Sequence, residues 1–161
     1  AGRTKTGTAT EYAAALTAFE KALALKPDYA PAHFAIIQMF DREGRADDAI
    51  ARAERLRALA PNDAGTLLEL GIVHYNALRM DKAQGVLEQA VRIAPDYANA
   101  LYFLGLVYEK QGDRARALTQ FEHVLKLNPK SAELKDIVQN VRAGKSALNT
   151  GSVPAPLQEK K

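Results

Sequence analysis

Hydrophobic residues along this chain recur at intervals of three and four positions, in runs that are separated by short polar turns. Such spacing places the apolar side chains on one side of an α-helix. No run shows the two-residue alternation of a β-strand. We therefore predict an all-α fold with helices over residues 11–25, 31–43, 47–59, 64–77, 81–93, 98–111, 114–127 and 131–143.

One constant interval separates four prolines, Pro27, Pro61, Pro95 and Pro129. Proline disfavours helical geometry in the preceding residue and suits the start of a new helix, so each proline marks the end of one helix and the approach of the next. A second polar break divides the intervals, at residues 43–45, 79–81 and 111–113. Each period therefore contains two helices.

The repeat with the fullest pattern is Ala98–Pro129. Its first helix carries Leu101, Leu104-Gly105 and Tyr108, and its second helix carries Ala117, Phe121 and Val124. This pattern resembles the tetratricopeptide repeat (TPR). The resemblance implies a right-handed α-solenoid of antiparallel helix pairs, with three full repeats and a half-repeat at each end.

The other two repeats match less closely. Ala64–Pro95 has His74 in place of the tyrosine, and Ala30–Pro61 has Ile37 in place of the glycine and Ala53 in place of the large residue. Glycine costs about 1 kcal/mol relative to alanine within a helix, so a close approach of the paired helix should offset it. We expect Ala83 and Ala117 to be the small residues that face Gly71 and Gly105, and we expect a large-for-small exchange between Ile37 and Ala53.

The predicted organisation has three parts. A flexible segment covers residues 1–10, a TPR domain covers residues 11–143, and a tail rich in Pro, Ser and Lys covers residues 144–161. The domain is a half-repeat (11–29), repeats 30–63, 64–97 and 98–129, and a capping helix (130–143).

Both ends of the domain hold one helix of a pair. Either the last helix is a cap and the first belongs to an incomplete repeat, or the two ends complete a repeat between neighbouring copies. In the second case self-association would use Phe19, Leu134, Ile137 and Val141. Glu133 and Asp136 argue against it, because they occupy positions that are apolar in a first helix.

The resemblance places the first helix of each repeat along a concave groove. The groove positions that repeat packing does not use are largely aromatic or aliphatic, whereas a solvated surface would carry charge. An exposed strip of this kind favours binding of a polypeptide segment with apolar anchors. The alternative is that these side chains pack within the stack or are covered by the tail. The candidate groove residues are Phe34, Gln38, Leu68, Ile72, Tyr75, Asn76, Asn99, Tyr102, Phe103, Leu106 and Lys110.

One class of partner is excluded by the resemblance. TPR domains that hold the acidic C-termini of chaperones use a cationic clamp at set groove positions. Here these positions hold Phe34, Gln38, Glu69, Asn99 and Phe103.

The remaining composition indicates no catalytic or nucleic-acid chemistry. Residues 11–143 contain 17 basic and 18 acidic side chains, so the excess of positive charge lies at the two ends and nucleic-acid binding is not expected. Cysteine is absent, and the three histidines lack the close spacing of a metal site. Asp47 and Asp48 suit the start of a helix, and the arginines at 52, 55 and 57 suit a solvated surface. We expect no enzyme activity, no cofactor and no metal.

The leading function is a protein-interaction scaffold, and the alternative is a structural subunit that associates head to tail, a homo-oligomer. No run reaches the length of a membrane-spanning helix, so direct membrane insertion is not expected. We expect a soluble domain, in the cytoplasm rather than outside it, although a membrane-tethered parent protein is compatible with the same sequence.

Overall fold

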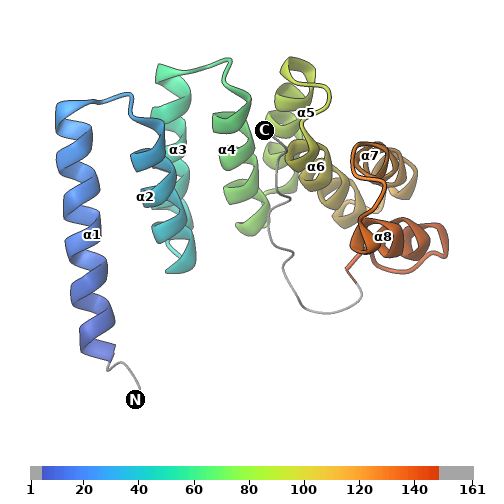
Figure 1. Ribbon diagram of the computed structural model, residues 1–161, viewed down its shortest axis with the longest axis horizontal. Coiled ribbons are helices and arrows are strands. Elements are labelled where there is room, and N and C mark those ends of the chain that lie inside the picture. The colour runs from blue at the N-terminus through green and yellow to red at the C-terminus, as the bar shows by residue number, and fades with distance from the viewer. Residues whose placement is uncertain (1–4, 149–161) are drawn as a thin grey trace. The chain divides into compact units, whose positions relative to one another are not determined.

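The computed structural model describes residues 5–148, and of residues 5–9 the backbone alone. This part of the chain is all-α and contains no strand, which confirms the predicted class (Figure 1). It divides into two compact units, Ala1–Pro61 and Asn62–Lys161. The helices are α1 (Lys5–Leu25), α2 (Ala30–Arg42), α3 (Ala46–Leu59), α4 (Ala64–Asn76), α5 (Met80–Ile93), α6 (Ala98–Lys110), α7 (Arg114–Leu127) and α8 (Ala132–Arg142).

Seven helices begin and end within one residue of their predicted limits, and α1 is the exception. It begins at Lys5, so residues 5–10 are helical rather than part of a flexible segment. Once a helix has formed, each further residue adds a hydrogen bond, so a helix can extend through threonines that carry no start signal of their own. The prediction of a flexible segment is therefore wrong for residues 5–10, and residues 1–4 lie outside the described residues.

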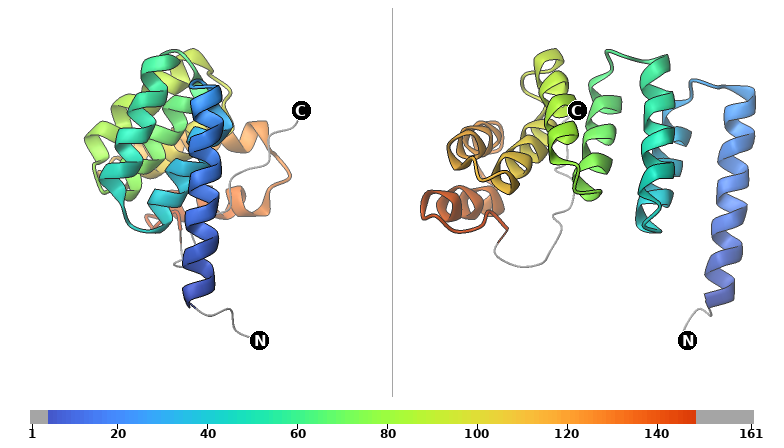
Figure 2. Two further views of the ribbon diagram at one scale, coloured as in Figure 1. Left: turned by 90° about the vertical axis from the view of Figure 1, so that its left-hand side faces the viewer. Right: turned by 180° about the vertical axis from the view of Figure 1, so that it is seen from behind.

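The first unit consists of α1, α2 and α3. Helices α2 and α3 form an antiparallel pair, and α1 packs on α2 (Figures 1 and 2). On α1 only Leu23 is fully buried among the described side chains, whereas Phe19 is half-buried. The main core lies between the other two helices and consists of Ala32, Ile36, Ile37, Ala49, Ala53 and Leu56.

The second unit consists of α4 to α8, in which each helix packs on the next. Helix α4 also contacts α6, the first helix of the following repeat. The pairs α4–α5 and α6–α7 form the most extensive contacts, as expected for the two helices of a repeat. The largest fully buried side chains are Leu67, Leu70, Leu87, Leu101, Leu106, Phe121 and Leu134.

Two helical glycines mark the points of closest helix approach. A Cβ atom on Gly71 would lie 2.5 Å from Cγ of Leu87, and one on Gly105 would lie 2.8 Å from Cε1 of Phe121. The predicted close approach is confirmed, but the expected partners were wrong, because each glycine faces a large side chain and not Ala83 or Ala117. A large residue fits here only because the glycine leaves room for it.

The first unit has a large residue where the other two repeats have the helical glycine, and a small residue where they have the large facing side chain. By the interval that separates the prolines, Ile37 corresponds to Gly71 and Gly105, and Ala53 corresponds to Leu87 and Phe121. Both Ile37 and Ala53 are buried, on helices that pack together. The structure therefore supports the predicted exchange of a large for a small side chain between the two helices.

The turn within each repeat requires a left-handed backbone at one residue. Gly44 and Gly112 adopt φ angles of 72° and 83°, and Leu78, at the corresponding position, adopts 58°. Leucine is disfavoured in this conformation by its Cβ atom. Leu78 is 77% exposed, so packing does not compensate for this cost.

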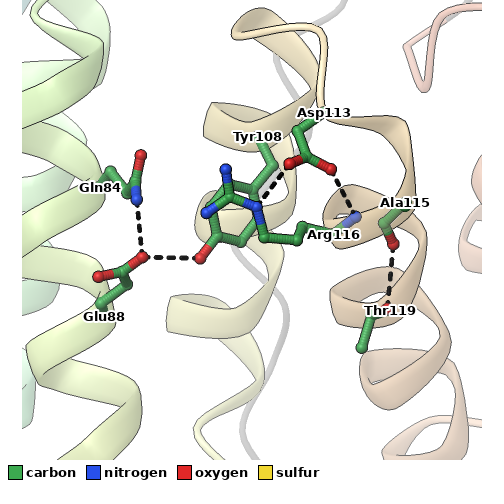
Figure 3. A network of polar contacts seen from close by, with 7 residues as sticks. All are labelled: Gln84, Glu88, Tyr108, Asp113, Ala115, Arg116 and Thr119. Carbon is green, nitrogen blue, oxygen red and sulfur yellow. Dashed lines mark hydrogen bonds and ion pairs between the residues drawn. The ribbon is translucent and has the colours of Figure 1, made fainter.

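A polar network links the second and third repeats (Figure 3). The hydroxyl of Tyr108 on α6 donates to Glu88 on α5 at 2.8 Å, and Gln84 donates to the same carboxylate oxygen. The guanidinium of Arg116 lies 4.3 Å from the centroid of the Tyr108 ring and pairs with Asp113, which also caps α7 by accepting from the Arg116 amide. The network thus connects α5, α6 and α7 at the consensus tyrosine.

Candidate protein-binding face

Helices α4 and α6 lie next to each other within the second unit and carry nine of the predicted groove residues. We call this surface the α4–α6 face. Its members are positions of the first helices that the repeat pattern does not assign to packing between helices. They are Leu68, Ile72, Tyr75 and Asn76 of α4 and Asn99, Tyr102, Phe103, Leu106 and Lys110 of α6.

Aromatic side chains connect the two helices. The ring of Tyr75 meets that of Phe103 edge-on, with centroids 6.1 Å apart and an interplanar angle of 75°. Phe103 in turn meets Tyr102 at 5.7 Å, and Tyr102 meets Phe121 of α7 at 5.9 Å. Edge-to-face contacts of this kind hold aromatic rings in defined orientations. The face is therefore continuous with the core of its repeat.

The members of the α4–α6 face differ in exposure. Leu68, Tyr102 and Leu106 are 6%, 4% and 2% exposed, so the expectation of an exposed strip is wrong for these three residues. Tyr102 is covered in part by its two neighbouring rings. The members that retain partial exposure are Ile72, Tyr75, Asn99 and Phe103, and those that are fully exposed are Asn76 and Lys110.

Negative charge surrounds the two tyrosines of this face. Burial raises the pKa of Tyr75, and the carboxylate of Glu109 raises it further. Burial is also the main reason for the raised pKa of Tyr102, with further contributions from Glu133 of α8, Tyr75 and Glu109. Both phenols therefore remain protonated donors at neutral pH. Acids of α6 and α8 therefore add to the effect of burial on the pKa values of these two phenols.

The chain returns to α6 after the last helix. Ala147 is 2% exposed, and its backbone N–H donates to a carboxylate oxygen of Glu109 at 2.5 Å. The sequence reasoning assigned residues 144–161 to a tail, and no pattern around Ala147 indicates this contact. The alternative that the tail covers the candidate groove also involves residues 149–161, which lie outside the described residues.

The other predicted site residues lie elsewhere. Phe34 and Gln38 are on α2 of the first unit, where the former is half-buried and the latter is exposed. Of the predicted self-association residues, Phe19 is half-buried on α1, while the three on α8 are 0–4% exposed, so little of their surface is available to a neighbouring copy. These three are Leu134, Ile137 and Val141.

Each of the three histidines is either buried or hydrogen-bonded to an acid. His33 and His74 are buried, as predicted, and Nε2 of His33 lies 2.9 Å from the carbonyl oxygen of Pro27. His123 is partly exposed, and its Nε2 lies 2.9 Å from a carboxylate oxygen of Asp96. Among residues 5–148 no group of three or more acidic or histidine side chains is placed to hold a metal ion.

The charged clusters also have local partners. Asp47 and Asp48 lie in the first turn of α3, where the helix dipole favours acids. Arg52 is mostly buried and pairs with Glu20 of α1, so it is not purely a solvated side chain. In the described part of the chain, no helix combines the length and apolar character that crossing a bilayer requires.

Antiparallel helix pairs that recur at a constant interval define a repeat protein of the α-solenoid class. Two tetratricopeptide repeat family models match the sequence, one over residues 8–70 and one over residues 62–130. The chain belongs to the tetratricopeptide repeat family.

The chain is also similar to individual proteins. It is 30% identical over 135 residues to the cytochrome c-type biogenesis protein CycH of Rhizobium meliloti (strain 1021), a match that covers 82% of this chain and 35% of the relative. The chain thus spans about a third of that relative's length. A thermophilic TPR protein of Thermus thermophilus aligns with a TM-score of 0.70 and 25% identity, over 85% of this chain and 76% of that one.

A further solved structure is the first TPR domain of Spaghetti (RPAP3) bound to the HSP90 peptide SRMEEVD. It aligns with a TM-score of 0.67 and 16% identity, over 71% of this chain and 91% of that one. At this identity the similarity concerns the fold alone. It also shows that a domain of this fold can hold a peptide.

Proposed function

We propose that the α4–α6 face binds a segment of a partner protein, and that the chain acts as a non-catalytic interaction scaffold. The observation that carries this proposal is a set of partly exposed apolar side chains, Ile72, Tyr75 and Phe103, on two adjacent helices. Rigid aromatic rings lose little conformational entropy on binding and are frequent anchors in interfaces. The rings here are already oriented by edge-on contacts.

The partner differs from the acidic peptide bound by the Spaghetti domain. A cationic clamp is needed for the carboxylates of such a peptide. At the corresponding positions this chain has Phe34, Gln38, Glu69, Asn99 and Phe103. Because these residues supply no positive charge and one of them is acidic, we propose that acidic chaperone C-termini are not ligands.

The similarity to CycH supports a proposal for the cellular role of the chain. The match covers 82% of this chain, and that relative's name places it in cytochrome c-type biogenesis. We therefore propose that the face recruits a protein of that process. Deletion of the gene in its own organism should reduce the haem-stained c-type cytochromes on a denaturing gel, and normal levels would contradict this role.

The binding proposal can be tested with a random peptide library displayed on phage and selected on the immobilised full chain. Variant Ile72→Glu/Phe103→Glu should weaken binding of the selected peptide at least tenfold, or about 1.4 kcal/mol. These side chains are preferred to Tyr102 and Leu106, because charge at a buried position would unfold the repeat.

The matched control is Ile93→Glu/Leu127→Glu, which makes the same changes at exposed apolar positions of the same unit. It should leave the affinity unchanged. Equal binding by both variants, with unchanged circular dichroism, would exclude the α4–α6 face as the site. If the library yields no binder at all, the proposed function itself fails.

Self-association is the second candidate function, and one observation on helix α1 favours it. Helix α1 buries only Leu23 fully among its described side chains, so Leu16 and Phe19 keep some exposed surface. Sedimentation equilibrium should then show a mass that rises with concentration, and Phe19→Glu should abolish the rise. A constant monomer mass would contradict this candidate and leave the binding proposal intact.

A further inference from the structure

Three acids on α6 and α8, Glu109, Glu133 and Asp136, determine the charge next to the α4–α6 face. On the outer helices carboxylates pair with arginines, as in Glu54–Arg57 and Glu122–Arg142. Within the described residues, no cation lies within ion-pair distance of Glu109, Glu133 or Asp136. Within that part of the chain, their negative charge is therefore not neutralised by an ion pair.

The repeat register places these acids together. By the interval that separates the prolines, Glu133 and Asp136 of α8 occupy the positions that Asn99 and Tyr102 occupy on α6. Glu109 lies on α6 itself, and both it and Glu133 act electrostatically on the phenol of Tyr102. Lys110 is the one basic residue at the corresponding positions of the described helices α4, α6 and α8. The net charge of this region is negative.

A buried donor provides an independent indication of a ligand. Tyr102 is 4% exposed, and its hydroxyl has no hydrogen-bond partner within the described residues. A buried polar group without a partner is energetically unfavourable. Burial is the main reason for the raised pKa of this phenol, and Glu133, Tyr75 and Glu109 raise it further. A carbonyl oxygen of a bound chain would supply the missing acceptor.

We propose that the α4–α6 face, together with Glu133 and Asp136, binds a basic segment of a partner protein. The aliphatic parts of this segment lie on Ile72, Tyr75 and Phe103, and its lysine or arginine side chains meet Glu109, Glu133 and Asp136. The Tyr102 hydroxyl donates to a backbone carbonyl of the same segment. This inference rests on the proposed function and adds the charge of the partner.

The physical basis is charge complementarity. Opposite charges accelerate association and select against partners of the same sign. Long side chains of lysine and arginine also combine an aliphatic stem with a charged end, so they can cover apolar surface and reach a carboxylate at once. An acidic segment would meet repulsion from the three carboxylates that lack an ion-pair partner among the described residues.

The test uses the library selection on the full chain. Peptides that bind should be enriched in lysine and arginine, and depleted in aspartate and glutamate, relative to the unselected library. Variant Glu109→Gln/Glu133→Gln/Asp136→Asn should weaken the best peptide at least tenfold and reduce the dependence of its affinity on salt. Control variant Glu54→Gln/Asp96→Asn/Glu122→Gln makes the same change in net charge elsewhere and should leave both quantities unchanged.

Tyr102→Phe gives a second readout, because it should weaken the peptide severalfold without lowering the melting temperature. Selected peptides that are neutral or acidic, or that bind the neutralised variant equally well, would overturn the charge assignment while the binding proposal stands. A synthetic peptide of residues 149–161, which ends in Lys160 and Lys161, is included as a competitor. If it binds more tightly than every selected peptide, or if the full chain forms a dimer that the neutralised variant cannot form, the partner assignment is wrong.

Discussion

Single residues determine how closely the helices of each repeat approach. Gly105 faces the ring of Phe121, whereas Gly85 on α5 has nothing within 4 Å of the position a Cβ atom would take. The same substitution should therefore have opposite effects at the two sites. The sequence predicted that Gly71 and Gly105 mark close contacts, because glycine is costly in a helix. It did not predict their partners, since the facing residue depends on the relative rotation of the two helices.

Gly105→Ala should lower the free energy of unfolding by about 1–3 kcal/mol, because the methyl group overlaps a buried ring. Gly85→Ala should raise it by up to about 1 kcal/mol, the difference in helix propensity. Urea unfolding followed by circular dichroism measures both. Stabilisation by Gly105→Ala would show that the two helices are farther apart than the structure indicates.

Leu78 provides a second test at the residue scale. It adopts a left-handed backbone at the position where the neighbouring repeats have glycine. Leu78→Gly should stabilise the protein by about 1 kcal/mol through relief of this strain. Leu59→Gly, at an exposed residue at the end of α3, serves as the control and should not stabilise. A lower melting temperature for Leu78→Gly would contradict the assignment.

At the scale of elements, hydrogen bonds between neighbouring repeats supplement the apolar contacts. Tyr108 joins α6 to α5 through Glu88, while the Tyr102 hydroxyl on the same helix has no partner among the described residues. Sequence reasoning identified Tyr108 as the consensus tyrosine. It did not identify the Glu88 contact, because their separation of 20 residues gives no local signal.

The two tyrosines should respond differently to loss of the hydroxyl. Tyr108→Phe should lower the free energy of unfolding by about 0.5–1.5 kcal/mol, because it leaves Glu88 without this donor. Tyr102→Phe should leave the free energy of unfolding unchanged or raise it, because no hydrogen bond is lost and a buried hydroxyl without a partner among the described residues is removed. Chemical denaturation of both variants at neutral pH makes the comparison. A larger loss for Tyr102→Phe would reveal a hydrogen bond that the account does not include.

Alkaline pH should destabilise the second unit. Burial raises the pKa values of Tyr75, Tyr102 and Tyr108 in the folded chain. The unfolded chain therefore loses these protons first, and stability that is present below about pH 10 should decline as the pH rises further. The slope of unfolding free energy against pH should be smaller for Tyr102→Phe than for the parent chain. An identical slope would contradict burial of this phenol.

For the whole molecule, the regular spacing of the prolines made it possible to predict the fold from the sequence. The predicted limits of seven helices agree with the structure to within one residue. The TPR family follows from the pattern of small and large residues within each period. The candidate face was less predictable. The sequence identified the positions of α4 and α6 that the repeat pattern does not use for packing. It did not predict that Leu68, Tyr102 and Leu106 are buried, because burial depends on contacts between repeats.

The contact between Ala147 and Glu109 shows the same difference between what local sequence patterns predict and what long-range contacts determine. A contact between residues 38 positions apart, made through a backbone amide, carries no pattern of side-chain types. The predicted helix limits rely on local periodicity, whereas this contact relies on the path of the chain after α8. Long-range placement of this kind required the structure.

The central claim is that partners bind on the α4–α6 face, and photo-crosslinking tests it most directly. A peptide selected on the full chain would carry a diazirine analogue of leucine at an apolar position, and mass spectrometry would identify the crosslinked residues. The account predicts crosslinks to Ile72, Tyr75 and Phe103 on α4 and α6. Crosslinks confined to α1, α5 or α7 would contradict it.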